Sequence, residues 1–191
     1  MKKGLLIVVS APSGCGKGTI LKQILKDEKY YYSVSATTRK PREGEIDGVH
    51  YCFLNHEQFE NLIAENAFLE HASYCGNYYG TLRKPIEENL ANGRHVILEI
   101  EVNGAMQIRK LCPEAKFIFI APPSLDAVKK RLEHRGTESA EVIAQRLQQA
   151  EQELCYKNQY DYCIINDILK EAIADFESVI RAEELKIIPN A

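Results

Sequence analysis

A short apolar run followed at once by a glycine-rich loop is the feature that most constrains this chain. Residues Leu5 to Val9 are continuous, apolar and rich in β-branched side chains, as expected for a strand covered on both faces. Glycines stand at positions 14, 16 and 18, a lysine stands at 17, and a helical pattern begins at Thr19. This strand–loop–helix order favours an α/β fold with a parallel sheet.

The composition of the loop indicates a phosphate site. Glycines allow a phosphate to approach several consecutive backbone N–H groups, because no side chain blocks them. The start of the following helix adds partial positive charge, and Lys17 adds a full one. A glycine-rich turn without a ligand is the alternative. The candidate residues are Ala11, Pro12, Ser13, Gly14, Cys15, Gly16, Lys17, Gly18 and Thr19.

The loop departs from the strict pattern G-x-x-x-x-G-K-[ST] at two positions. Ala11 stands where the first glycine belongs, and Gly18 stands where a Mg²⁺-binding hydroxyl belongs. Thr19 comes one position too late. We therefore predict no residue of the chain as a metal ligand.

Composition excludes several other classes. The chain has 191 residues, which fits one domain, and its formal net charge of −3 does not fit a protein that coats nucleic acid. No stretch approaches the roughly 20 apolar residues of a membrane helix, and the N-terminal apolar run is too short for a signal peptide. The six cysteines have neither C-x-x-C nor zinc-ligand spacing. We expect reduced thiols and a cytoplasmic protein.

Strand and helix patterns alternate along most of the chain, as in a parallel α/β sheet. Further strands are predicted at His95–Ile100, Lys116–Ile120 and Tyr162–Ile165. Helices are predicted at Thr19–Lys26, Leu82–Ala91, Asn103–Leu111, Ser124–Arg135, Ser139–Tyr156 and Ile168–Glu184. Residues 35–81 break the alternation. There Val49, Tyr51 and Phe53 alternate as in a half-exposed strand, so we expect an inserted lobe with antiparallel character.

The inserted lobe contains a second candidate anion site. Arg39, Lys40 and Arg42 surround Pro41, and guanidinium groups suit a phosphate. A solvated basic loop is the alternative. Glu70 follows an apolar pair and is either a binding carboxylate or the solvent side of a strand. The nearby tyrosines are either hydroxyl donors or core residues with exposed tips.

The chain resembles the guanylate kinase family. The segments that carry the resemblance are S-A-P-S-G-C-G-K-G-T, S-V-S-A-T-T-R-K-P-R-E-G-E, N-Y-Y-G-T, L-E-I-E-V-N-G-A, F-I-A-P-P-S, K-R-L-E-H-R-G-T-E and I-I-N-D. They occur in the family's order and cover nearly the whole chain. The resemblance implies a P-loop nucleoside-monophosphate kinase fold over 4–184. Its parts would be a parallel core (1–34, 82–123 and 157–191), a mixed-β GMP-binding lobe (35–81) and a mobile helical lid (124–156).

The resemblance also implies roles for individual residues. Residues 11–19 match the ATP phosphate loop, and Asn166 and Asp167 match positions beside the ATP base. The GMP-binding positions are matched by Ser35, Arg39, Arg42, Tyr51, Glu70, Tyr79, Thr81 and Glu101. Glu101 departs from the family, which usually has Asp there. The lid positions that contact the transferring phosphate are matched by Arg131, Arg135 and Arg146. Lys17 and Arg42 would add positive charge for the transfer.

The chemistry of guanine agrees with this assignment. Guanine presents two donors on one edge, N1–H and the N2 amine, and an ionised Glu70 could accept from both. Adenine has an acceptor at N1 that would repel a carboxylate. Ser35 and Thr81 could address O6 and N7.

We therefore expect an enzyme that transfers phosphate in line from ATP, with Mg²⁺, to GMP and to dGMP. No general base is needed, because a phosphate monoester is largely dianionic at neutral pH. Arg131 and Arg135 share a helix face, Gly136 is a plausible hinge, and Lys129 and Lys130 are read as a solvated face. The alternatives are a scaffold-type binding module and a kinase for another monophosphate such as AMP. Self-association into a homo-oligomer is left open.

Overall fold

The computed structural model describes residues 3–74, 76–135 and 139–187, without the side chains of Tyr74 and Arg135. It divides into two compact units. The first unit consists of Met1–Val8 and Asp27–Lys116, and the second consists of Val9–Lys26 and Phe117–Ala191. The main sheet has five strands in the order β2-β7-β1-β8-β9. Its strand β1 (Leu6–Ser10) is buried along its whole length, which confirms the buried strand expected from the sequence.

In the first unit, β2 (Tyr30–Tyr32) pairs in parallel with β7 (His95–Glu99). Helix α3 (Arg83–Ala91) packs against β7, and helix α4 (Val102–Leu111) packs against β5 (Phe68–Tyr74). The predictions of a strand at 95–100 and of helices at 82–91 and 103–111 are confirmed to within a residue or two. The short strand β2 was not predicted.

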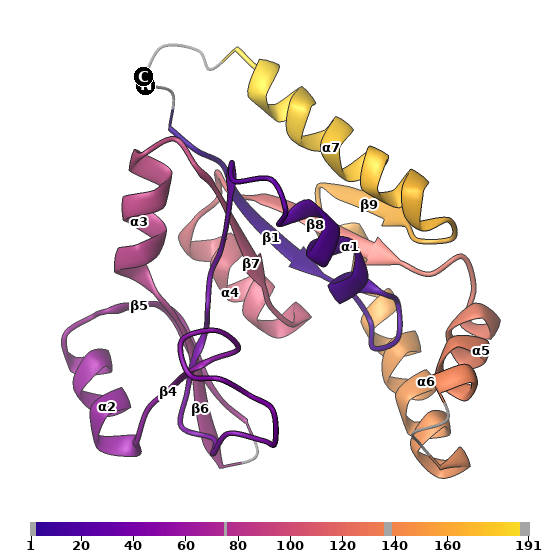
Figure 1. Cartoon of the computed structure of the whole chain (residues 1–191), viewed down its shortest axis with the longest axis horizontal. Coiled ribbons are helices and arrows are strands. Elements are labelled where there is room, and N and C mark those ends of the chain that lie inside the picture. The colour runs from indigo at the N-terminus through magenta and orange to yellow at the C-terminus, as the bar shows by residue number, and fades with distance from the viewer. Residues whose placement is uncertain (1–2, 75, 136–138, 188–191) are drawn as a thin grey trace. The chain divides into compact units, whose positions relative to one another are not determined.

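The first unit also contains a separate four-stranded sheet, in the order β4-β3-β6-β5 (Figure 1). Strands β3 (Ala36–Thr37) and β4 (Cys52–Phe53) run parallel, whereas β6 (Asn77–Leu82) is antiparallel to both β3 and β5. The sheet is therefore mixed. Helix α2 (His56–Ala64) covers it with Phe59, whose ring stacks on Phe68 at 4.3 Å between centroids. A capping box of Asn55 and Gln58 begins this helix, which we had not predicted.

The expected half-exposed strand through Val49, Tyr51 and Phe53 is wrong over most of its length. Only Cys52 and Phe53 belong to a strand, and Val49 lies in a turn with 57% of its surface exposed. The physical reason is Gly48, whose φ of +74° turns the chain back so that its N–H donates to the Tyr51 carbonyl at 2.8 Å. Alternation of side chains is not evidence for a strand where the backbone turns.

The second unit is mainly helical. Helix α1 (Lys17–Ile24) follows the loop, and β8 (Lys116–Ala121) pairs in parallel with β9 (Tyr162–Ile165). Helices α5 (Leu125–Arg135) and α6 (Ala140–Leu154) pack against each other, and α7 (Leu169–Leu185) packs against α1 and β9 (Figure 1). A short 3₁₀ helix spans Lys157–Gln159.

Two predicted helix starts in this unit are confirmed by their caps. The Ser124 hydroxyl accepts from the Ala127 N–H at 3.1 Å, and the Ser139 hydroxyl accepts from the Val142 N–H at 3.4 Å. The lobe and lid boundaries 35–81 and 124–156 stay predictions; the four-stranded sheet and the α5–α6 pair lie in these regions. Within the described ranges, no helix combines the length and the apolarity needed to span a membrane.

Candidate nucleotide-binding sites

The glycine-rich loop lies between β1 and α1, as predicted. Gly14 and Gly16 have φ values of +80° and +83°, a backbone conformation that residues with a Cβ rarely adopt. Gly16 is also the N-cap residue of α1, with no side chain to satisfy the first helical N–H groups, and the first turn of α1 contains no acidic residue. A helix N-terminus that has no side-chain cap and no competing carboxylate suits an anion.

Gly18 differs from the other loop glycines. Its φ is not in the left-handed region, and a Cβ built at Gly18 would meet nothing within 4 Å. A Cβ at Gly16 would lie 2.5 Å from the Nδ2 of Asn166. The loop therefore requires glycine at position 16 by its conformation and by its surroundings, whereas position 18 has room for a side chain.

A cavity of about 610 Å³ lies beside the loop in the second unit. It is large enough for a nucleotide-sized ligand. Its lining residues are Gly14, Gly16, Thr19, Lys130, Arg131, His134, Asn166, Asp167 and Leu169. Lys130 is exposed, as expected for a solvated face, and it also borders this cavity. Lys130 and His134 are one helical turn apart on α5, which is why both reach the cavity.

The predicted lid arginines differ in what the structure shows of them. Nη1 of Arg146, on α6, donates to the hydroxyl of Ser13 in the loop at 3.0 Å. Nη2 of Arg131, on α5, donates to the Asn166 carbonyl at 2.7 Å. Its Nη1 is buried and has no hydrogen-bond partner among the described residues. The side chain of Arg135 and the residue Gly136 lie outside the described part of the chain.

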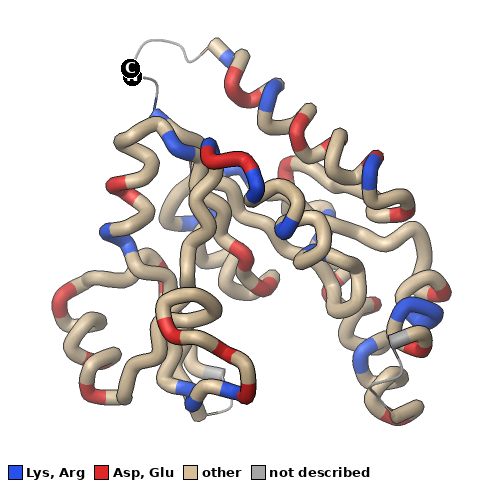
Figure 2. The backbone as a smooth tube through the Cα atoms, viewed as in Figure 1, with Lys and Arg blue, Asp and Glu red and all other residues tan. Residues whose placement is uncertain are grey.

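Arg131 is therefore available for an anion at one nitrogen. A buried N–H without a partner is costly, and an anionic oxygen would satisfy it. Figure 2 shows basic residues gathered along α5, the helix that carries Arg131.

Cys15 anchors the loop by packing against α5 and α6. It is fully buried in a cluster with Val128, Leu132 and Ile143, which come from α5 and α6. Burial raises the pKa of the Cys15 thiol to about 12, although Arg131 and Lys17 act in the opposite direction. The thiol therefore stays protonated and acts as a small apolar side chain, as the sequence suggested.

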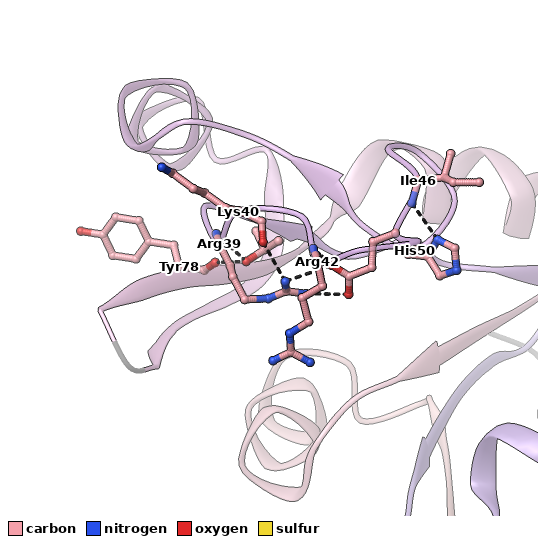
Figure 3. Close-up of polar contacts among 8 residues, drawn as sticks. Arg39, Lys40, Arg42, Ile46, His50 and Tyr78 are labelled. Atoms are coloured by element: carbon pink, nitrogen blue, oxygen red, sulfur yellow. Dashed lines mark hydrogen bonds and ion pairs between the residues drawn. The ribbon is translucent and has the colours of Figure 1, made fainter. Parts of the chain in front are cut away.

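The basic segment of the first unit is held by a carboxylate that sequence reasoning missed. Arg39 donates from Nη1 and Nη2 to the two carboxylate oxygens of Glu45, at 3.0 and 2.9 Å (Figure 3). The backbone N–H of Arg42 donates to Glu45 at 2.7 Å, and Nη1 of Arg39 also donates to the Lys40 carbonyl at 2.8 Å. These bonds hold the pKa of Glu45 at about 2, so its carboxylate is ionised at neutral pH.

The predicted phosphate ligands surround this pair. The Arg39 guanidinium lies 5.3 Å from the ring centroid of Tyr51, and Tyr51 lies 6.2 Å from Tyr79, which also interacts with Arg39. Figure 3 shows the Arg42 side chain extending away from the pair. Its guanidinium makes no hydrogen bond or ion pair with the described residues. The structure thus brings Arg39, Tyr51 and Tyr79 together and leaves Arg42 uncommitted beside them.

A second group of predicted residues gathers around Glu70 on β5. Thr81, opposite it on β6, donates its hydroxyl to Glu70 Oε1 at 2.6 Å. Burial raises the pKa of Glu70, although Thr81 and His71 act against this. Glu70 is therefore a half-buried carboxylate with a designated donor, which argues against the solvent-side alternative.

Glu101 lies at the N-terminal end of α4, and Glu70 of β5 lies close to that end. Glu101 is the N-cap residue of α4, and a Cβ on Gly104, in the first turn, would lie 3.9 Å from Glu70 Oε2. The Glu101 side chain is exposed and does not cap the helix. Ser35 directly precedes β3, where its carbonyl accepts from the Cys52 N–H at 2.9 Å.

The second missed contact joins Tyr32 and Glu99. The Tyr32 hydroxyl donates to Glu99 Oε2 at 3.1 Å, and burial raises the pKa of Tyr32. No local pattern could have indicated this pair, because 67 positions separate the two residues. Glu45, by contrast, is only three residues from Arg42, so its contact with the basic segment could have been predicted from the sequence.

The described residues are suited to a metal ion only where a bound phosphate supplies most of its ligands. The described residues contain no group of three or more His, Cys, Asp or Glu side chains that could hold a metal ion. Mg²⁺ in proteins commonly takes its ligands from substrate phosphates and water, with one or two protein groups. Thr19 and Asp167 are the lining residues of the cavity that carry a hydroxyl or a carboxylate.

Comparison with known proteins agrees with the geometry of both sites. The family model described as "Guanylate kinase" matches residues 3–183. The chain belongs to the guanylate kinase family. A guanylate kinase of Carboxydothermus hydrogenoformans is 52% identical over 187 residues, which are 97% of this chain and 92% of that protein. One from Desulfitobacterium hafniense is 48% identical over 185 residues, covering 96% and 92%.

A solved structure supports the same family. The crystal structure of guanylate kinase from Anaplasma phagocytophilum matches with a TM-score of 0.77 and 32% identity, covering 97% of this chain and 89% of that one. The α/β fold with a parallel core and a guanylate-kinase architecture, expected from the resemblance, is confirmed.

The contrast between Gly16 and Gly18 gives a prediction about stability. Gly18→Ala should raise the free energy of unfolding by about 0.5–1 kcal/mol, because alanine restricts the unfolded chain and fits the native helix. Gly16→Ala should lower it by at least about 1–2 kcal/mol, because its φ is left-handed and its Cβ would press on Asn166. Urea denaturation of both variants measures the difference. Equal effects would show that the two positions are equivalent.

Proposed function

We propose that this chain catalyses the ATP-dependent phosphorylation of GMP to GDP, a step that recycles GMP in purine nucleotide metabolism. The observation that carries the proposal is the match to guanylate kinases along residues 3–183. This range includes both the glycine-rich loop and the lobe with Arg39 and Glu70. The geometry of each site supports one of the two substrates.

The second unit supplies the site for ATP. The loop offers backbone N–H groups at the start of α1, and Lys17 is the first residue of that helix. The Arg146 guanidinium reaches the loop through Ser13. We assign the triphosphate to the loop and the adenine base to the cavity lined by Asp167 and Leu169.

Glu70 would select guanine in the first unit. Its ionised carboxylate would accept from guanine N1–H and from the N2 amine. The Thr81 hydroxyl holds one carboxylate oxygen at 2.6 Å and so limits the orientations of the side chain. Adenine would present an acceptor to the same carboxylate. A site built for hydrogen bonding can reject such a mismatch by about 10⁴-fold.

Arg39 and Arg42 would bind the phosphate of GMP. A guanidinium has five N–H groups, and contacts to Glu45 and Lys40 use three of those on Arg39. Tyr79 also interacts with this guanidinium. The N–H groups that these contacts leave, together with the Tyr51 and Tyr79 hydroxyls, are suited to phosphate oxygens. Glu45 keeps the fork of Arg39 in place, so less conformational entropy is lost when phosphate binds.

The reaction we propose is direct in-line transfer of the γ-phosphoryl group to a phosphate oxygen of GMP. That oxygen is already largely deprotonated at neutral pH, so the chain needs no general base. The task of the protein is to bring two anions together and to exclude water. The positive charge would come from Lys17, Arg42, Arg131, Arg135 and Arg146. The last three belong to the proposed lid.

Mg²⁺ would accompany ATP, with Thr19 and Asp167 as the hydroxyl and the carboxylate that the cavity lining offers it. It would neutralise charge on the β- and γ-phosphates. We extend the proposal to dGMP, because the groups assigned above act on the base and the phosphate.

The cytoplasm remains our expectation for the location of the protein. The five cysteines whose side chains the structure describes are free thiols. Self-association is left open, and neither nucleic acid nor a membrane is proposed as a partner.

Substrate selectivity tests the proposed activity. Release of ADP should be rapid with GMP and with dGMP, and about 10³-fold to 10⁴-fold slower with AMP or UMP. Lys17→Ala should abolish turnover while circular dichroism and thermal melting stay unchanged. Turnover with AMP but not GMP would contradict the assignment of Glu70. Binding of GMP without turnover would favour a binding module.

Glu70→Gln should raise KM for GMP by about 10-fold to 100-fold, because a hydrogen bond to a charged group is worth about 1.5–3 kcal/mol. The ratio of the two KM values should shrink as the pH falls. The raised pKa of Glu70 means that the native carboxylate protonates at a higher pH than an exposed one, and it then loses its advantage over glutamine. Taking the ratio removes the titration of the GMP phosphate itself. A ratio that is constant between pH 4 and pH 8 would contradict the role of the ionised carboxylate.

Glu45→Gln should raise KM for GMP about tenfold and change kcat and KM for ATP much less, because the Arg39 fork loses a charged partner. Glu87→Gln is the control, since Glu87 pairs with Arg83 at 3.9 Å on the exposed surface. If Glu45 instead competed with phosphate for Arg39, the variant would have a lower KM. Steady-state kinetics distinguishes the two results.

A further inference from the structure

Asn166 has a structural position that a contact to the adenine base does not require. It follows β9 directly, and only 6% of its surface is exposed. A buried amide needs hydrogen-bond partners. Its Nδ2 donates to the carbonyl of Cys15, in the glycine-rich loop, at 2.7 Å. The side chain is thus committed to the backbone of the loop.

The main chain of Asn166 is held just as firmly. Its N–H donates to the Ala121 carbonyl, at the end of β8, at 2.8 Å. Its carbonyl accepts from Nη2 of Arg131 at 2.7 Å. One residue therefore joins the end of the sheet, the loop and an arginine of α5, all within the second unit.

The contact between Asn166 and the loop is close enough to constrain both. The Nδ2 atom occupies the space that a Cβ on Gly16 would enter, at 2.5 Å. Gly16 is the residue at which the loop turns into α1 with a φ of +83°. A change in the Asn166 amide would therefore alter the orientation of the N–H groups that follow Cys15.

The contact to Arg131 has a matching consequence. With Nη2 bonded to Asn166, Nη1 stays buried and without a partner among the described residues, although Arg131 lines the cavity. An oxygen of a polyphosphate would supply the missing acceptor.

We propose that Asn166 is a positioning residue for the triphosphate: its amide sets the loop, and its carbonyl sets Arg131. This rests on the assignment of ATP to the second unit. It replaces the expectation that the Asn166 side chain reads the base. The affinity for the polyphosphate then depends on Asn166, whatever base the polyphosphate carries.

The test uses inorganic tripolyphosphate, which has no base, beside ATP and ITP. Calorimetry is done with the full chain and magnesium. Asn166→Asp is nearly isosteric, but it replaces the donor by an oxygen facing the Cys15 carbonyl, and Asn166→Ala removes the amide. Both variants should bind tripolyphosphate and ATP about tenfold more weakly, by the same factor. The ATP-to-ITP affinity ratio and the affinity for GMP should stay unchanged.

Asn158→Asp is the matched control, because Asn158 is an exposed residue of the same unit and makes the same change of charge. If the Asn166→Asp variant does not fold, Asn166→Ala carries the comparison. Weaker binding of ATP with unchanged tripolyphosphate binding, or a shifted ATP-to-ITP ratio, would overturn the proposal. The proposal would also be overturned if the wild-type protein bound neither tripolyphosphate nor ATP. Wild-type binding without turnover of GMP would contradict only the proposed function, since the Asn166 comparison needs no catalysis and its expected losses would still support this inference.

Discussion

The conformation of the loop between Ser13 and Lys17 is the constraint on which the second unit depends. Gly14 and Gly16 have positive φ values there, and a loop in that conformation needs support from the rest of the unit. Here the support is apolar and polar at once: Cys15 is packed against α5 and α6, and its carbonyl is bonded to Asn166. Helices α5 and α6 therefore also hold the loop in shape.

In the first unit the main constraint is the concentration of positive charge around Arg39 and Arg42. Arg39 and Arg42 would repel each other if both were uncompensated. Glu45 accepts from the guanidinium of one and from the backbone N–H of the other, and its low pKa keeps it charged. The result is one arginine fixed in orientation and one left uncommitted. A phosphate would need little rearrangement to bind to such an arrangement, because the fork is already in place.

The accuracy of the sequence predictions varied with the range of the interactions involved. Buried strands and serine-capped helices are local features, and β1, β9 and the starts of α5 and α6 were predicted correctly. Strands β3 and β4 have only two residues each and exist because β6 pairs with β3. No local pattern marks them. The alternation at 49–53 was misleading because the turn at Gly48 overrides it.

The amino-acid sequence by itself determined the family, the α/β class and the residue types at each candidate site: glycines and a lysine at one, arginines and a carboxylate at the other. These follow from composition and order along the chain. Only the tertiary structure decided that Glu45 holds Arg39, that Thr81 holds Glu70, and that Asn166 is bonded to the loop. The Asn166 and Cys15 partners are 151 positions apart, and Arg131 and Asn166 are 35 apart. Such pairings depend on how buried polar groups find partners once the chain has packed, which no short stretch of sequence encodes.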